Sequence, residues 1–243
     1  MGKGKSLQPI ILGEHFIPVT LYKEWRRSIR FSITKKGLVI RCPIVTPIKE
    51  LVDHSNSWCQ NLLVKNPGAL VEFKYVDYTH SPTIELYGDT YDIEFNYQDI
   101  SKDQIKWDKN KINIILSEGY NAFQASTSIR DLLTKFAVRR YTTTITERVH
   151  QLNEAHFNVE INHVRLKNNR TNWGSCSSKG NINLSIRLLK APHEVLDYVI
   201  IHELAHRIEM NHSKKFWKLV EDVCPNHKTY EKWLKENSHL CHI

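Results

Sequence analysis

The amino-terminal half of the chain alternates apolar and polar residues over short runs, a pattern typical of strands with one buried face. One helical pattern, from about residue 47 to residue 64, interrupts these runs. No internal repeat or low-complexity linker is visible in the sequence. The pattern predicts a small β-rich unit with one helix in residues 1–120, and its strands are predicted at 15–22, 28–34, 38–42, 83–87, 91–96 and 111–116.

The period of the apolar residues changes after Gly119. From Ser128 to Ala155 they recur every three or four positions, as on one face of a long helix, and Ser126 is placed to cap that helix. We expect the apolar stripe to pack against a sheet. The stripe comprises Ile129, Leu132, Leu133, Phe136, Ala137, Tyr141, Ile145 and Val149.

Two strands of an antiparallel hairpin are predicted next, at 165–176 and 181–189, with Gly180 completing the turn between them. In the second strand Ile182, Leu184, Ile186 and Leu188 alternate with polar residues, so one face of this sheet should lie on a core. An apolar helix follows, and two terminal helices are separated at Pro225. Residues 121–243 are therefore predicted to form an α+β domain, with a domain boundary near residue 120.

The apolar helix carries His-Glu-x-x-His, which predicts a metal site. His202 and His206 are four residues apart, so their imidazoles lie on one face of a helix. Glu203 is rotated by roughly 100° from His202, which leaves it near the metal without making it a ligand. That is the place of a general base. The run of apolar residues that leads into the motif predicts burial, and burying these polar groups without a metal would cost several kcal/mol, on the order of ~2–7 for each group.

A third ligand is expected shortly after the motif, and two residues are candidates. His212 lies six residues after His206, on the far side of a continuous helix, so the helix has to end between them. Asn211 tolerates the left-handed conformation that closes helices, and Ser213 can cap the next helix, at 214–223. Glu209 is the alternative ligand, because it follows His206 by three residues on nearly the same face. We prefer His212, because Asn211 and Ser213 indicate that the helix ends there. A ligand at Glu209 would not require the helix to end.

The motif, read as His-Glu-Leu-Ala-His-x5-His-Ser-x-x-Phe-Trp, follows a second block, Arg170-Thr-Asn-Trp-Gly-Ser-Cys-Ser-Ser-Lys-Gly-Asn-Ile-Asn-Leu-Ser185. Together they resemble the YgjP-like metallopeptidases, relatives of the SprT-like proteases. The resemblance implies a zincin-like catalytic domain with zinc ligands at His202, His206 and His212 and a catalytic Glu203. The family supplies no defined substrate.

The second block also offers candidates for substrate contacts. Zinc peptidases commonly bind an extended substrate as an added strand at the edge of a sheet, through main-chain hydrogen bonds. The predicted hairpin would provide such an edge, with Trp173 in the wall of the cleft. The alternative is that Trp173 belongs to the core and Gly174 forms a β-bulge. The candidate substrate-binding residues are Arg170, Asn172, Trp173 and Ser175.

Positive charge is concentrated in the carboxyl-terminal half. Residues 121–243 contain 18 Lys and Arg against 12 Asp and Glu, whereas residues 1–120 contain 16 against 14. A basic rim near the metal site would attract nucleic acid non-specifically, and a solvated basic surface is the alternative explanation. The residues of this rim are Arg139, Arg140, Arg148, Lys214, Lys215 and Lys218.

The sequence also bears on cellular location and on whether the cysteines form disulfides. No apolar run approaches the roughly 20 residues that span a bilayer, and no hydrophobic signal region follows the basic start, so we expect no membrane partner and a cytoplasmic protein. Five cysteines without a Cys-x-x-Cys pair argue against a disulfide framework. A second zinc site among the cysteines and histidines of residues 224–242 is not favoured, because the spacings fit no common finger.

These observations predict a zinc metallopeptidase with one Zn²⁺ per chain and a protein or peptide substrate. Glu203 would take a proton from the attacking water and pass it to the leaving amine. Arg170, Tyr198 and His163 are candidates for the donor to the developing oxyanion. Two alternatives remain: a metal-dependent hydrolase of a non-peptide amide, and a zinc-stabilised module that binds DNA or protein with little catalysis.

Overall fold

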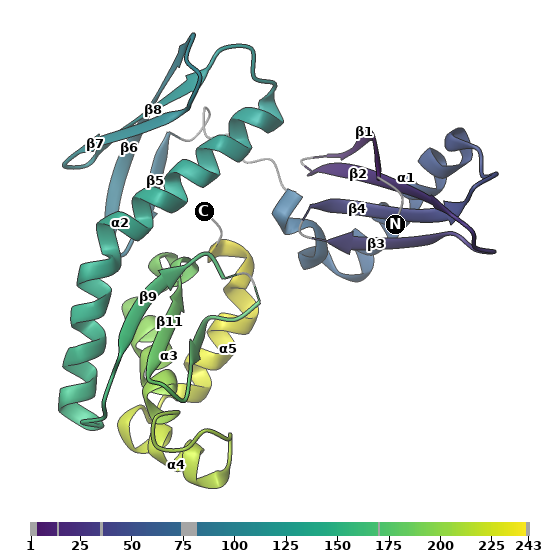
Figure 1. Ribbon diagram of the computed structural model, residues 1–243. Coiled ribbons are helices and arrows are strands. Elements are labelled where there is room, and N and C mark those ends of the chain that lie inside the picture. The colour runs from purple at the N-terminus through teal and green to yellow at the C-terminus, as the bar shows by residue number, and fades with distance from the viewer. Residues whose placement is uncertain (1–3, 14, 35, 74–81, 170, 242–243) are drawn as a thin grey trace. The chain divides into compact units, whose positions relative to one another are not determined.

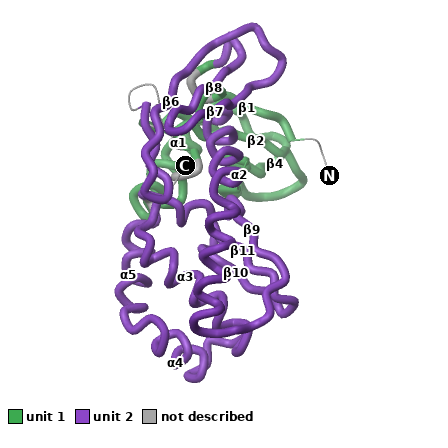
Figure 2. Tube along the Cα trace, turned by 90° about the vertical axis from the view of Figure 1, so that its left-hand side faces the viewer, with its two compact units in different colours: residues 1–77, 121–126 green, residues 78–120, 127–243 purple. Residues whose placement is uncertain are grey.

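A computed structural model describes residues 4–13, 15–34, 36–73, 82–169 and 171–241 (Figure 1). The chain divides into two compact units, which Figure 2 distinguishes by colour. The first comprises Met1–Asp77 and Asn121–Ser126, and the second comprises Tyr78–Tyr120 and Thr127–Ile243. The boundary predicted near residue 120 stays a prediction.

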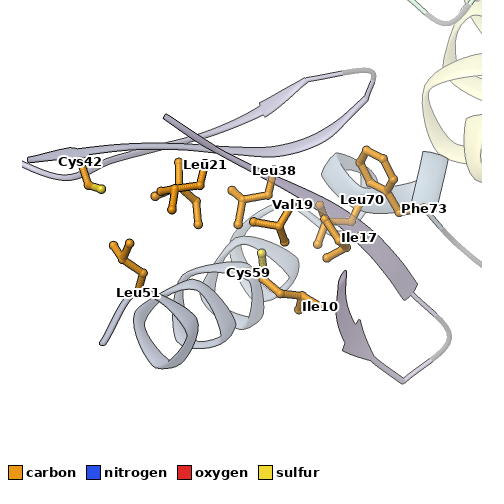
Figure 3. Packing of buried hydrophobic residues seen from close by; sticks show 11 residues of the cluster. Ile10, Ile17, Val19, Leu21, Leu38, Cys42, Leu51, Cys59, Leu70 and Phe73 are labelled. Carbon is orange, nitrogen blue, oxygen red and sulfur yellow. The ribbon is translucent and has the colours of Figure 1, made fainter. Parts of the chain in front are cut away.

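The first unit is a four-stranded sheet with a helix on one face. Strand order is β1-β2-β4-β3, with β2 and β4 parallel and both outer pairs antiparallel. Side chains of β2 and β4, among them Val19 and Leu38, point towards Leu51 and Cys59 of the helix and form the core (Figure 3). The elements are β1 (Lys5–Leu12), β2 (His15–Glu24), β3 (Arg30–Thr34), β4 (Gly37–Pro43), α1 (Ile48–Lys65) and the 3-10 helix η1 (Pro67–Phe73).

The second unit begins with another four-stranded sheet, in the order β5-β6-β8-β7. The long helix α2 (Ala122–His156) packs on it, because Phe136 contacts Tyr91 and Trp107 edge to face, with ring centroids 5.0 and 5.1 Å apart. All eight residues of the predicted apolar stripe are buried, as expected. The strands are β5 (Thr83–Leu86), β6 (Asp89–Gln98), β7 (Gln104–Asp108) and β8 (Lys111–Ser117).

The start of α2 differs from the prediction. The helix begins at Ala122, six residues before Ser128, and Ser126 is not its cap. Asn121 and Gln124 cap it reciprocally: the Gln124 amide donates to Asn121 Oδ1 over 2.9 Å, and the Asn121 amide donates to Gln124 Oε1 over 3.0 Å. This is the capping box with Asn in place of Ser or Thr.

The two sheets, each with its following helix, are copies of one ββββα design. Strands β2, β3 and β4 and helix α1 begin at residues 15, 30, 37 and 48, and β6, β7, β8 and α2 begin at 89, 104, 111 and 122, each 74 residues later. Pairing is antiparallel, parallel and antiparallel in both sheets. Buried positions also coincide, for example Ile40 with Ile114 and Cys59 with Leu133. The structure therefore contains a repeat that the sequence does not show.

The remainder of the second unit surrounds the His-Glu-x-x-His helix. A three-stranded sheet, in the order β10-β11-β9, is followed by three helices, so the predicted α+β class is confirmed. The elements are β9 (His163–Lys167), β10 (Gly174–Cys176), β11 (Asn181–Ser185), the 3-10 helix η2 (Ile186–Lys190), α3 (His193–Ala205), α4 (Lys214–Val223), α5 (His227–Asn237) and the 3-10 helix η3 (Ser238–Cys241).

This sheet is mixed, not antiparallel as predicted. The stretch expected as one strand, 165–176, is divided between β9 and β10, which flank β11 on opposite sides. Strand β9 runs parallel to β11, and only β10 pairs with it as an antiparallel hairpin. The second predicted strand ends early, because Ser185 Oγ accepts from the Arg187 amide and caps a 3-10 helix there. Ile186 and Leu188 are buried within that helix.

Two further features concern the whole described chain. No helix among the described residues is long and apolar enough to cross a membrane. All five cysteines are free thiols.

Candidate functional site

Helix α3 presents the motif from a buried position. Its apolar residues are packed inside the second unit, as the run before the motif predicts. The helix ends at Ala205, and His206 is its C-cap in a right-handed conformation. The Glu209 amide then donates to the Ala205 carbonyl, which closes the turn. The left-handed conformation predicted for Asn211 was wrong, because Asn211 is not among the described residues with positive φ.

The third histidine is brought back to the other two by the start of α4. Ser213 caps this helix, as predicted, by accepting from the Phe216 amide over 3.3 Å. The ring nitrogens His212 Nε2 and His202 Nε2 are 3.1 Å apart. His202, His206 and His212 each offer a ligand atom, and these three atoms lie within 4.8 Å of one another. Glu209, the alternative ligand, is not in this group.

Surrounding residues hold the imidazoles in place. His206 Nδ1 lies 3.2 Å from the Glu209 carbonyl oxygen, to which it can donate, and such a bond leaves Nε2 free to bind a metal. The ring of Phe216 lies within 4.5–4.8 Å of all three imidazoles, centroid to centroid. Trp217 stacks on His212 at 5.8 Å. Sequence reasoning gave these two aromatic residues no role, although the Phe-Trp pair that closes the motif was the available signal.

The electrostatics favour neutral imidazoles and an uncharged carboxyl in the absence of a cation. Burial, with a smaller contribution from His206 and His212, lowers the pKa of His202 to about 4. Burial also lowers the pKa of His206. It raises the pKa of Glu203 to about 8. A neutral imidazole is the form that binds metals, and a nearby cation would lower the pKa of Glu203 again.

The site contains buried polar atoms without a protein partner. Glu203 is only 5% exposed. Neither Glu203 Oε2 nor His202 Nδ1 has a hydrogen-bond partner among the described residues. Such atoms are rare in folded proteins, and they are explained where a water or an ion is bound. Three convergent imidazoles beside a buried carboxylate therefore fit a catalytic zinc centre with three protein ligands.

Gly174 forms one wall of the Glu203 site. A Cβ atom at position 174 would lie 2.5 Å from Glu203 Oε1 and 2.7 Å from its Cγ. Gly174 pairs with Leu184 in regular register, so the β-bulge considered from the sequence is not present there. The glycine is needed for close approach of β10 to α3.

A cavity of about 540 Å³ opens beside His202 and Glu203, within the usual range for ligand sites. Among the substrate-binding candidates, Asn172 and Trp173 line it. Trp173 is half-buried beneath the Arg187 guanidinium, 3.9 Å from the ring centroid. The other lining residues are Thr171, Gly174, Arg187, Tyr198, Val199, Glu231, Leu234, Lys235 and Ser238.

The remaining substrate-binding and oxyanion candidates lie elsewhere. Ser175 does not line the cavity, and its Oγ accepts from Asn183 Nδ2 over 3.1 Å. Arg170 lies outside the described residues. Among the oxyanion candidates, His163 is exposed on β9, whereas Tyr198 lies in the cavity wall one turn before His202. The sequence gave no reason to expect Arg187 or Glu231 in the wall, because both arrive through tertiary packing.

Several residues of the predicted basic rim have internal partners. Arg148 binds Asp197 through two hydrogen bonds, of 2.8 and 2.6 Å. Lys218 pairs with Asp222. Arg139 lies over the ring of Trp107. Binding of nucleic acid stays a prediction.

Comparison with known proteins gives a family match. A family model described as YgjP-like, metallopeptidase domain, matches residues 27–237. Among solved structures, the crystal structure of the metallopeptidase zymogen of Pyrococcus abyssi abylysin is 26% identical over 38% of this chain and 93% of that chain, with a TM-score of 0.35. No curated protein matches the chain.

Proposed function

This chain belongs to the YgjP-like metallopeptidase family, and we propose that it hydrolyses peptide bonds with one Zn²⁺ held by His202, His206 and His212 and with Glu203 as general base. The observation that carries the proposal is the convergence of the three imidazoles beside a buried carboxylate. The nitrogen ligands suit zinc, and three protein ligands leave one position open.

When bound, the metal supplies a Lewis acid that polarises the scissile carbonyl and lowers the pKa of water. The carboxylate of Glu203 accepts a proton from the attacking water. It then returns this proton to the leaving nitrogen as the C–N bond breaks. Burial of Glu203 against Gly174 of β10 limits the positions that its carboxylate can adopt, so the proton acceptor is preorganised.

Strand β10 is the proposed binding edge for substrate, because it is the outer strand of its sheet and runs directly past Glu203. An extended peptide can pair with such an edge through its main chain, which gives affinity without strict sequence preference. Asn172 is held by its own bond to the Gly174 carbonyl, over 2.8 Å. Trp173 and Arg187 would contact side chains of the substrate in the cavity.

Tyr198 is the proposed donor to the oxyanion. Its side chain lines the cavity. Burial, reinforced by the charge of Glu231, raises the pKa of Tyr198 to about 12. The hydroxyl therefore keeps its proton at neutral pH and can donate it in a hydrogen bond.

The test separates the metal ligands from the base. Glu203→Gln should retain one zinc per chain and lose cleavage of an unfolded protein, whereas His212→Ala should lose both. Glu209→Gln is the matched control for the alternative ligand and should retain both. Zinc content is measured by mass spectrometry and cleavage by mapping new termini. An active Glu203→Gln protein would exclude Glu203 as the base.

The same experiment separates the other candidate functions. Turnover of small amides without cleavage of any unfolded protein would assign a non-peptide amide hydrolase. If the parent protein binds zinc and DNA or protein but hydrolyses neither substrate, the chain is a binding module.

A further inference from the structure

One end of the first sheet carries a group of exposed apolar side chains. Trp25 follows β2, Ile44 and Val45 follow β4, and Ile48 begins α1. Their exposed fractions are 97%, 43%, 88% and 39%. Glu24 and Pro43 are the last paired residues of the parallel strands, so Trp25 and Ile44 leave neighbouring strands at the same end. We call these four residues the apolar end surface.

The backbone of this surface is fixed. The Lys23 ammonium donates to the carbonyl oxygens of Ile44 and Thr46, over 3.0 and 2.9 Å, and so ties the loop after β4 to β2. Thr46 is itself buried. Ile44 and Val45 are therefore displayed from a turn that is tied to β2, which reduces the entropy lost when a partner binds.

The second copy of the ββββα design shows that the fold does not require apolar residues here. Seventy-four positions later, Trp25, Ile44 and Val45 are replaced by Asp99, Glu118 and Gly119, all exposed. The same turns in the same topology are thus built with Asp, Glu and Gly in one copy and with large apolar residues in the other. Transfer of apolar side-chain surface from water to an apolar interface is favourable, so burial of Trp25 and Val45 by a partner would stabilise the complex.

Charge around the surface is positive. Arg26 and Arg27 follow Trp25 in the chain, and Arg30 begins β3 with its side chain exposed. Of the nearby carboxylates, Glu24 is paired with Arg41 and Arg26, and Glu50 lies in the first turn of α1, so Arg27 and Arg30 carry the positive charge of this surface. A partner that covers the apolar end surface would therefore be favoured by acidic residues beside its own apolar side chains.

We propose that the apolar end surface is an exosite for substrate: it binds an apolar segment with acidic flanks in an unfolded protein chain, apart from the segment that is cleaved. This inference rests on the proposed peptidase function and names part of its substrate. Tryptophan and arginine beside aliphatic residues are the composition of protein-binding hot spots.

Binding is measured first, on the full-length Glu203→Gln protein, which cannot consume its ligand. The probes are two synthetic peptides with the same leucine and phenylalanine segment, one flanked by aspartates and one by lysines. The aspartate peptide should bind more tightly, and Trp25→Asp and Val45→Glu should each weaken its binding about thirtyfold, the scale of a lost hot-spot residue. Val64→Glu is the matched control, since Val64 is 83% exposed in the same unit, and it should bind like the parent.

Cleavage is measured second, with active enzyme. For a long unfolded protein, Trp25→Asp and Val45→Glu should raise KM and leave kcat unchanged, whereas a short peptide around the cleaved bond should be hydrolysed as by the parent. If the parent protein does not hydrolyse the short peptide, the peptidase proposal is weakened. The exosite proposal is then tested by the binding measurements alone. Three results would overturn the exosite proposal. In the first the two peptides bind equally, in the second both variants bind like the parent, and in the third the surface binds anionic lipid vesicles and neither peptide.

Discussion

Gly174 and Glu203 approach each other more closely than any other residue type at position 174 would allow. A Cβ atom there would lie 2.5 Å from Glu203 Oε1, 2.7 Å from Cγ and 2.9 Å from Cδ. All three atoms belong to a side chain that can rotate, so the glutamate would yield before the backbone of β10 moved. The absence of a side chain at position 174 therefore determines where the carboxylate of Glu203, the proposed general base, can lie.

Gly174→Ala should therefore reduce peptide hydrolysis by about a hundredfold, the scale expected when a catalytic group moves by about 1 Å. Zinc content should stay at one per chain, because none of the proposed ligands is displaced. Gly68→Ala is the control, since its Cβ would meet the nearest atom at an ordinary 3.5 Å. Initial rates on one peptide decide the outcome, and a fully active Gly174→Ala enzyme would contradict it.

The ion pair of Arg148 with Asp197 should stabilise the second unit through its fork geometry. Arg148 Nε and Nη2 donate to the two carboxylate oxygens over 2.8 and 2.6 Å, and this joins α2 to α3. Lysine cannot make both bonds. Because the two side chains are 36% and 22% exposed, we expect Arg148→Lys to lower the free energy of unfolding by only about 1 kcal/mol. Urea unfolding of Arg148→Lys, Asp197→Asn and the double variant tests this, and additive effects would argue against coupling.

Glu203 should destabilise the metal-free protein at alkaline pH. Its pKa is raised from 4.5 to about 8 in the folded state, so folding takes up a proton between these two values. The resulting loss of stability grows from about pH 4.5 to about pH 8 and is constant above. In Glu203→Gln this loss is absent, so the chelated variant should exceed the chelated parent in stability by about 5 kcal/mol at pH 8.5 and by little at pH 4.5. A difference independent of pH in urea unfolding would contradict the assignment.

The capping box at the start of α2 predicts a third stability effect. Asn121→Ala should lower the free energy of unfolding by about 1 kcal/mol, because the Gln124 amide loses its acceptor. Ser126→Ala is the matched control. Ser126 Oγ is buried without a hydrogen-bond partner among the described residues, so its removal should be neutral or stabilising. Thermal unfolding that ranks the two variants in the opposite order would restore Ser126 as the cap.

The sequence predicted best where a pattern is long or local. The eight-residue stripe of α2 and the bounds of α4 were read correctly, because a helical period repeats over several turns and Ser213 marks a start. Two strands were missed. Strand β1 contains Pro9, at which its register with β2 shifts, and β7 is only five residues long. Strand β1 therefore shows no clear alternation, whereas Gln104–Asp108 does alternate polar and apolar residues but gives only two apolar positions.

The repeat was invisible for a different reason. Only five positions between 10 and 65 carry the same residue as the position 74 further along, namely Ile10, Leu12, Lys35, Ile40 and Val64. What the copies share is which positions are buried and where the chain turns, and many different apolar residues satisfy that requirement. The contact of Gly174 with Glu203 was also unpredictable, because nothing local to either residue indicates that β10 crosses α3 there.

The three proposed ligands lie within eleven consecutive residues, 202 to 212. Closing so short a loop costs little chain entropy and needs no contact of high sequence separation. Enclosure of Glu203, in contrast, requires β10, and β10 requires β11. We therefore expect a folding intermediate in which the ligand loop has closed but β10 has not yet paired to hold zinc without hydrolysing peptide bonds.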